Sequence, residues 1–138
     1  MNVEELAWAA GFFDGEGSIT AKRVKRASVY RYFRATVVQT DRRVLDRFVV
    51  ATGTHRPVTG PHHPPSRNER TSPQYIVDAL GYPAEAMIAG LWAWLSEPKR
   101  EQAMRVLEIC APSWGRRTTS PLLERIQHEE TLVDVLQF

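Results

Sequence analysis

AAGFFDGEGSI, residues 9–19, is the stretch that decides the fold, because it places three glycines and two carboxylates at the end of an apolar segment. The apolar residues in and before it recur at helical spacing: Leu6, Ala9, Ala10 and Phe13. Asn2 can cap the first turn, and Gly15 and Gly17 can end the helix. We therefore predict a helix over residues 3–14, followed by an extended segment.

One face of this helix is predicted to carry very little side-chain bulk. Ala7, Ala10, Gly11 and Asp14 share that face at positions i, i+3, i+4 and i+7. The aromatic side chains of the same segment point elsewhere, into the domain's own core. A second helix backbone could therefore approach the small-residue face very closely, and two such helices would bring their terminal acids near one another.

The segments that follow have the composition of two strands and then a helix. Residues 18–25 and 30–39 alternate and are rich in Val, Ile, Thr, Tyr and Phe, which favours a pair of connected strands. Asp41 is placed to cap a helix over residues 42–52, and Gly53 is placed to stop it. The sequence thus predicts a helix, two strands and a second helix in succession.

The rest of the chain is predicted to form strands over 54–60 and 74–80, separated by a proline-rich loop, and helices around 84–95, 99–110 and 121–138. Pro83 and Pro98 suit the first turns of two of these helices. Residues 1–138 are therefore predicted to be a single α+β domain. Its core, about residues 1–110, has the order helix, strand pair, helix, strand pair, helix with an antiparallel sheet, and about residues 111–138 form a C-terminal helical extension.

The bulk properties agree with one domain. A chain of 138 residues with 43% hydrophobic residues can bury one compact core but not two. Its apolar runs are interrupted before the roughly 18 to 20 residues of a membrane span, and Glu4 and Glu5 stand where a signal peptide would be basic. A soluble intracellular protein without a membrane partner is expected. Cys110 is the only cysteine, which excludes an internal disulfide or a cysteine zinc site and favours a core position.

Positive charge is concentrated in one part of the chain. The formal net charge is only +2, yet residues 17–40 hold six basic residues and no acid, whereas the chain beyond Gly81 holds six basic and eight acidic residues. A solvated face is the simplest explanation of most charge runs. Basic residues that alternate with aromatics and lack interspersed acids indicate instead a surface built to face anions.

A twisted antiparallel ribbon fits the DNA major groove, so the predicted strands are candidates for a DNA-binding surface. An error of one residue in register would turn every side chain to the other face, so no single base contact is assigned. The candidate DNA-binding residues are Lys22, Arg23, Lys25, Arg26, Tyr30, Arg31, Arg34, Arg56, Arg67 and Arg70.

Residues 9–17, AAGFFDGEG, resemble the signature helix of the LAGLIDADG homing endonucleases. The departures are Ala for the leading Leu, Phe-Phe for Leu-Ile, Gly for the second Ala, and Glu for the second Asp. The predicted order of elements also follows that family over roughly the first 110 residues. A second copy is not found, because IAGLWAWLSEP, from Ile88, has Trp94 and Leu95 where the acids should be. The resemblance therefore implies a homodimer joined through the signature helix, with Ala7, Ala10, Gly11 and Asp14 at the interface.

The resemblance also implies an active site. Glu16, the backbone carbonyl of Gly15 and, with less support, Asp14 would hold Mg²⁺, for which Mn²⁺ can substitute; carboxylate, water and phosphate oxygens are the ligands that Mg²⁺ prefers. The other catalytic residues matched to the family are Gln39, Arg43 and Lys99, with Arg42 as a rival for Arg43. Gln39 could orient water, and the two cations could offset charge that develops on the phosphate.

These features favour a site-specific endonuclease that hydrolyses both strands of double-stranded DNA at a long, nearly palindromic site with a divalent metal. The alternative is a non-cleaving binder of the same fold, either an intron RNA maturase or a DNA-binding regulator. The retained Asp14 and Glu16 favour the enzyme, because a pure binder needs no metal ligands. A glycosidase that uses the same two acids is disfavoured by the basic strands and by the lack of a sugar-stacking pattern.

Overall fold

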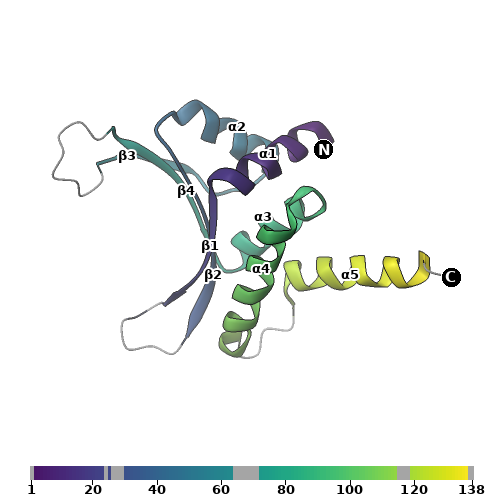
Figure 1. Ribbon diagram of the computed structural model, residues 1–138. Helices are drawn as coiled ribbons and strands as arrows, with labels where there is room; N and C mark the ends of the chain where they lie inside the picture. Colours follow the sequence, from purple (N-terminus) through teal and green to yellow (C-terminus); the bar gives the residue numbers. More distant parts are fainter. Residues whose placement is uncertain (1, 24, 26–29, 64–71, 115–118, 137–138) are drawn as a thin grey trace.

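The computed structural model describes residues 2–23, 25, 30–63, 72–114 and 119–136, with the side chains of 133–136 left aside. A bent antiparallel sheet carries its helices on one face, and the concave face is turned away from them (Figure 1). The long C-terminal helix extends away from the sheet. None of the helices in the described part of the chain is long and apolar enough to cross a membrane.

The elements follow the predicted order, which confirms the α+β fold class. The first half of the chain forms α1 (Val3–Glu16), β1 (Gly17–Arg23), β2 (Arg31–Gln39) and α2 (Arg42–Thr52). The second half forms β3 (Val58–His62), β4 (Gln74–Leu80), α3 (Tyr82–Leu91), η1 (Trp92–Trp94), α4 (Glu97–Cys110), η2 (Ala111–Trp114) and α5 (Pro121–Leu136).

The ends of several elements differ from the prediction. Helix α1 continues to Glu16, so Gly15 lies inside its last turn instead of ending it. Strand β3 begins at Val58, four residues later than predicted. It includes Pro61, which has no backbone N–H to donate, and an edge strand such as β3 tolerates proline because one of its sides has no neighbouring strand. The helix predicted around 84–95 ends at Leu91 and continues as the short 3-10 helix η1.

The sheet has the order β1-β2-β4-β3, and all neighbouring strands are antiparallel. Gly17 lies opposite Val37 and Thr36 lies opposite Asp78, which fixes the register of three strands. The side chains that face the helices at the centre of the sheet are buried: Ile19, Phe33, Ala35, Val37, Val77 and Ala79. Because side chains alternate along a strand, the residues between them lie on the concave face.

The junction between α1 and β1 requires glycine for steric reasons. Gly17 has an ordinary extended backbone, but a Cβ added there would lie 2.4 Å from the ring of Phe13. That ring is fully buried, so it has no room to move aside. The last glycine of the signature stretch therefore lets β1 leave α1 directly over Phe13.

Aromatic packing joins α1 to α2. Trp8 stacks on Phe12 with ring centroids 5.4 Å apart, and Phe13 stacks on Phe48 at 6.3 Å. Arg47 of α2 covers the Trp8 ring at 3.8 Å and pairs with Glu5 at 2.7 Å. Trp8 and Phe12 are thus only partly buried, at the edge of the core that they were predicted to fill.

The C-terminal part of the chain joins the same core. Leu122 and Ile126 of α5 are buried together with α3, and Ser120 donates a hydrogen bond to the buried Glu85 carboxylate. Cys110 is 1% exposed, as its helical context predicts. Burial, together with the nearby Glu85 charge, raises the pKa of the Cys110 thiol to about 11, although Arg31 acts in the opposite direction. The thiol is therefore protonated and unreactive at neutral pH.

Candidate active site and nucleic-acid interface

Glu16 and Gly15 lie at the exposed C-terminal end of α1. Among the residues that the structure describes, none forms a hydrogen bond or an ion pair with the Glu16 side chain. The Gly15 carbonyl belongs to the last turn, where carbonyl groups have no donor within the helix. The last turn holds no basic residue, although this end of a helix is its negative pole. This end of α1 therefore attracts a cation.

The Asp14 side chain forms hydrogen bonds with Ser96, at the start of α4. Its carboxylate accepts hydrogen bonds from the Ser96 backbone N–H at 3.1 and 3.2 Å and from the Ser96 hydroxyl at 2.9 Å. Ser96 occupies the N-cap position of α4, although its side chain makes no capping hydrogen bond to that helix. The Asp14 carboxylate thus connects the negative end of α1 to the positive end of α4, a favourable alignment of charge and helix dipoles.

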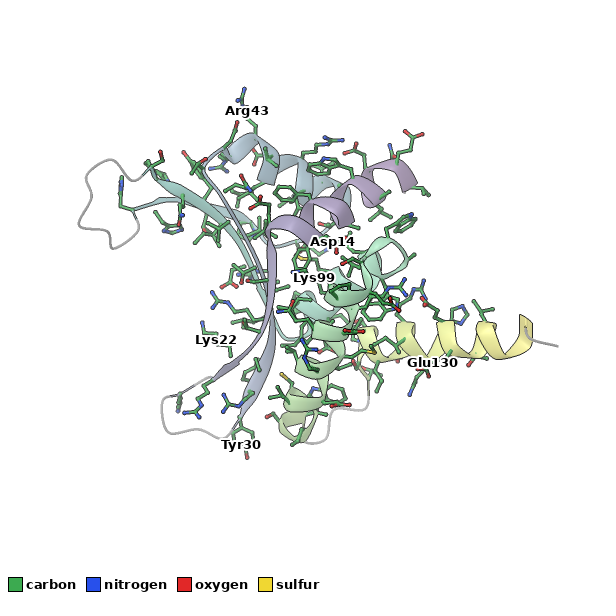
Figure 2. The ribbon with its side chains drawn as sticks, in the orientation of Figure 1. Asp14, Lys22, Tyr30, Arg43, Lys99 and Glu130 are labelled. Carbon is green, nitrogen blue, oxygen red and sulfur yellow. The ribbon has the colours of Figure 1, made fainter. Side chains whose placement is uncertain are left out.

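Lys99 reaches the same junction from the first turn of α4. Its Nζ donates to the Gly17 carbonyl at 2.9 Å and lies 5.7 Å from the centre of the Phe13 ring. One turn further along α4, Gln102 donates to the Ile19 carbonyl at 3.1 Å. The half-buried Lys99 ammonium is therefore held one residue away from Glu16. Figure 2 shows Asp14 and Lys99 close together where α1 meets the sheet.

Sequence analysis missed Ser96 and Gln102. Ser96 could have been identified as a helix cap by its position just before Glu97 and Pro98, but nothing in the sequence indicates its partner, Asp14, which is 82 residues away. Gln102 carries no sequence signal, because it bonds to a backbone carbonyl. Ser96 holds α4 against the end of α1, and Gln102 holds it against β1.

Gln39 lies at the same end of the sheet as Glu16. Gln39 is the last residue of β2. It lies two residues beyond Val37, the cross-strand partner of Gly17, and two residues span about 7 Å along a strand. Its own partner across the sheet is Tyr75. The half-buried Gln39 side chain therefore lies near the α1–β1 junction, and its proposed role toward water stays a prediction.

Arg43 lies apart from this group. Its guanidinium makes two hydrogen bonds to Asp41, of 3.0 and 2.7 Å, and its side chain is 89% exposed. These bonds lower the pKa of Asp41 to about 2. In Figure 2 Arg43 points outward from α2, away from Asp14 and Lys99. The rival Arg42 lies over the ring of Tyr75 at 5.9 Å, nearer to the end of β2, so the choice between them stays open.

The donors at the end of α1 fit a magnesium-type cation in number and chemistry. No cluster of three or more His, Cys, Asp or Glu side chains occurs within the described ranges, so His62 and the other histidines there form no such centre. One carboxylate and one carbonyl are available, Glu16 and Gly15. Mg²⁺ is commonly held by one or two carboxylates, waters and substrate phosphates. A cation at this position would thus depend on ligands from outside the single chain.

The register divides the candidate DNA-binding residues between two faces. Lys22 and Arg34 lie on the concave face, where Lys22 points away from the helices (Figure 2), whereas Arg23 and Arg31 alternate to the helix-facing side. Arg31 is cross-strand partner to Arg23, and its backbone N–H donates to Ser113. These two side chains therefore lie on the other face of the sheet from Lys22 and Arg34, and their role in DNA binding stays a prediction.

The other candidates lie at the margins of the sheet. Tyr30 is 57% exposed, just before β2, and Lys25 is exposed in the bend after β1. Arg56 is exposed ahead of β3, and its Nε donates to the Asp78 carbonyl at 2.9 Å. Arg26, Arg67 and Arg70 lie outside the described residues.

The small-residue face of α1 is rotated from its predicted position. Ala10 is fully buried in the chain's own core, so the prediction that it lies at a dimer interface is wrong. Gly11 and Gly15 are exposed, and Ala7 is half-buried one turn before Gly11. A Cβ added at Gly11 or Gly15 would meet nothing within 4 Å. The exposed stripe is therefore Ala7, Gly11 and Gly15, and nothing within the described part of the chain requires these two glycines.

Solved structures with a similar fold include homing endonucleases in complex with DNA. I-CvuI in complex with the I-CreI target and Mg is 25% identical to this chain, with a TM-score of 0.61 over 90% of this chain and 78% of I-CvuI. I-CvuI with its own target and Ca gives the same values. The archaeal intron-encoded I-Vdi141I, complexed with DNA, has a TM-score of 0.58 at 16% identity, over 78% of this chain and 67% of its own. No protein-family model and no curated protein sequence matches this chain.

The antiparallel four-stranded sheet backed by helices is therefore the homing endonuclease fold. Within that fold class, the resemblance to the LAGLIDADG homing endonucleases is confirmed, and the chain carries one copy of their signature helix.

The two acids of the signature helix are expected to respond differently to substitution. Asp14→Ala removes the contact with Ser96 and should lower the free energy of unfolding by about 1 kcal/mol. Glu16→Ala removes an exposed charge that has no partner among the described residues from the negative end of α1, so the free energy of unfolding should stay within about 0.5 kcal/mol of wild type or rise. Urea denaturation of both variants measures the difference, and equal destabilisation would contradict these separate roles.

Proposed function

We propose that the protein is a homodimeric, site-specific endonuclease that hydrolyses both strands of double-stranded DNA with Mg²⁺ or Mn²⁺. The observation that carries the proposal is the Glu16 carboxylate, which is exposed at the end of α1 directly before strand β1 and has no hydrogen bond or ion pair among the described residues. A carboxylate there would repel a DNA phosphate unless a cation lay between them. A carboxylate at this position would therefore weaken the DNA affinity of a protein that only binds DNA, whereas a metal-dependent nuclease would use it as a metal ligand.

In this proposal Glu16 and the Gly15 carbonyl hold the cation, and the remaining ligands come from water and DNA phosphate. A bound divalent cation would stabilise negative charge on the scissile phosphate and lower the pKa of water. Lys99, fixed by the Gly17 carbonyl, supplies a positive charge beside the same phosphate. Gln39 orients the attacking water, and Arg43 or Arg42 contributes a second positive charge from the start of α2.

The homodimer is supported by the glycines of α1. Gly in a helix interior is less favourable than Ala by about 0.5 to 1 kcal/mol, and Gly11 has open space around it in the single chain. A second helix backbone packed against Ala7, Gly11 and Gly15 would explain why these positions are small. That packing places the two α1 termini side by side, so each subunit supplies one Glu16, one for each DNA strand.

The dimensions of the sheet suit a long DNA site. Strand β2 has nine residues, which corresponds to about 30 Å. B-DNA rises about 3.4 Å for each base pair, so one sheet follows about nine base pairs of major groove. A two-fold symmetric pair of sheets would contact on the order of 18 base pairs in a nearly palindromic arrangement.

Glu16→Gln tests the chemistry. The substitution keeps the size of the side chain and removes its charge, so DNA binding in Ca²⁺ should persist while cleavage in Mg²⁺ falls on the order of 100-fold or more. The target is first selected from randomised duplex DNA with the wild-type protein, and cleavage is then followed on that DNA. Glu101→Gln, an exposed glutamate on α4, is the matched control and should cut like wild type.

The outcomes separate the enzyme from its alternatives. Wild-type cleavage should stop with chelator and return with Mg²⁺ or Mn²⁺. Binding without cleavage by the wild-type protein, under all of these metals, would favour a DNA-binding regulator or an RNA maturase. Equal cleavage by wild type and Glu16→Gln would refute the role of Glu16.

Gly11→Leu tests the assembly. Because a Cβ at Gly11 meets nothing within 4 Å in the single chain, the variant should keep its fold, measured by circular dichroism. Its sedimentation mass at micromolar concentration should fall from dimer to monomer, since a branched side chain would hold the two helices apart. Ala86→Leu, an exposed small residue on α3, is the control and should stay dimeric. A wild-type monomer, or a dimeric Gly11→Leu, would contradict the proposed interface.

A further inference from the structure

A carboxylate lies in the middle of the concave face, where the proposed function places a polyanion. Asp78 of β4 is directly opposite Thr36 of β2, and both alternate with buried residues that face the helices. Arg34 is two residues from Thr36 on the same face, diagonal to Asp78. The pair is only part-buried, since each side chain is 33% exposed. DNA in the groove of this sheet would meet Arg34 and Asp78 together.

The Asp78 carboxylate accepts hydrogen bonds from the Nε and Nη2 side of the Arg34 guanidinium. Arg34 Nε donates to Asp78 Oδ1 at 2.8 Å, and Nη2 donates to Oδ2 at 3.2 Å. Thr36 Oγ1 donates to Oδ1 at 3.0 Å, which fixes the carboxylate from the next position on β2. Two of the five Arg34 N–H groups are therefore used, and both hydrogens of Nη1 and one of Nη2 are left for a ligand.

The surroundings keep Asp78 ionised. Burial raises the pKa of Asp78, but the hydrogen bonds from Arg34 and Thr36 and the charges of Arg34 and Lys22 outweigh burial and leave it below its usual value. The Asp78 carboxylate is therefore charged at neutral pH, where it can hold the Arg34 guanidinium. Thr20 and Leu80, the cross-strand partners of Arg34, are uncharged, and the Arg34 side chain is 33% exposed.

A guanidinium held in this way favours a base edge over a phosphate. The adjacent carboxylate offsets the positive charge of Arg34 and repels a phosphate anion that approaches the pair. The edge of a guanine carries no net charge and presents two acceptors, N7 and O6, to the major groove. The end of the arginine fork, formed by Nη1 and Nη2, matches those two acceptors.

We propose that Arg34, positioned by Asp78, donates two hydrogen bonds to N7 and O6 of one guanine in each half of the DNA site. Arg34 is then a specificity-determining residue, and Asp78 is a positioning residue that acts through it. The inference rests on the proposed DNA-binding function and adds to it a defined base preference at one position of each half-site.

Selection from randomised duplex DNA tests the proposal by its effect on sequence preference. The full-length wild-type protein, Arg34→Ala and Asp78→Asn are each used in Ca²⁺, and the bound pools are sequenced. The wild-type pool should contain one position in each half-site where guanine is favoured by on the order of 10-fold or more. Both variants should lose the preference at that position and keep the preferences elsewhere.

Lys22→Ala is the matched control, because Lys22 lies on the same face one cross-strand row away from Arg34 and donates to no carboxylate within the described part of the chain. It should weaken binding evenly across sequences and leave the guanine preference in place. Unfolding midpoints establish that all four proteins are folded, and Thr36→Val provides a milder disturbance of Asp78 if Asp78→Asn is unstable.

Two results would overturn the inference while leaving the proposed function intact. The first is an unchanged guanine preference in both Arg34→Ala and Asp78→Asn. The second is an even loss of affinity at every position, which would assign Arg34 to a phosphate. A wild-type protein that binds no DNA in the selection would refute the proposed function itself, and this inference with it.

Discussion

The contact between Phe13 and Gly17 is the constraint on which the rest of the structure depends. Because Gly17 has no Cβ, β1 passes directly over the buried Phe13 ring as it leaves α1. This close passage sets the direction of the first strand relative to the helix, and it brings Gly17 opposite Val37 at the start of the pairing of β1 with β2. Lys99 and Gln102 then bond to carbonyls of β1 and hold α4 against the same junction.

Asp14 and Glu16, the two acids at the end of α1, differ in how their negative charge is compensated. Both Asp14 and Glu16 lie in the last turn of α1, where the helix dipole disfavours negative charge. Asp14 is compensated by the N-terminus of α4 through Ser96. Glu16 has no such compensation among the described residues, which leaves it available to a cation. One acid thus supports the fold, and the other supports the proposed chemistry.

Local sequence signals predicted the order of the elements and several of their ends. Helix α2 begins after Asp41 and ends before Gly53, as the capping preferences of these two residues predicted. Gly53 adopts the left-handed conformation with φ of 67°. Helix α1 was predicted too short because glycine near the end of a helix favours a stop, whereas Gly15 is tolerated within the last turn. Periodicity, composition and capping residues together gave the correct type of the α-helices and strands, but not the short 3-10 helices η1 and η2.

Contacts between distant segments could not be predicted in the same way. Ala7, Ala10 and Gly11 are all small, so the helical pattern could not show that Ala10 faces the core while Gly11 faces outward. The faces of Arg23, Arg31 and Arg34 depended on a register that only the pairing of β1, β2 and β4 defines. The pairing of Arg34 with Asp78, 44 residues apart, likewise has no local signature.

The central claim is that each subunit contributes one Glu16 to one of two active sites that face opposite DNA strands. The most direct measurement uses a mixed dimer of one wild-type and one Glu16→Gln subunit, co-expressed with different affinity tags and purified through both. On the site selected by the wild-type protein, strand-specific labels should show that this dimer nicks a single strand while wild type cuts both. A mixed dimer that cuts both strands as fast as wild type would contradict the account.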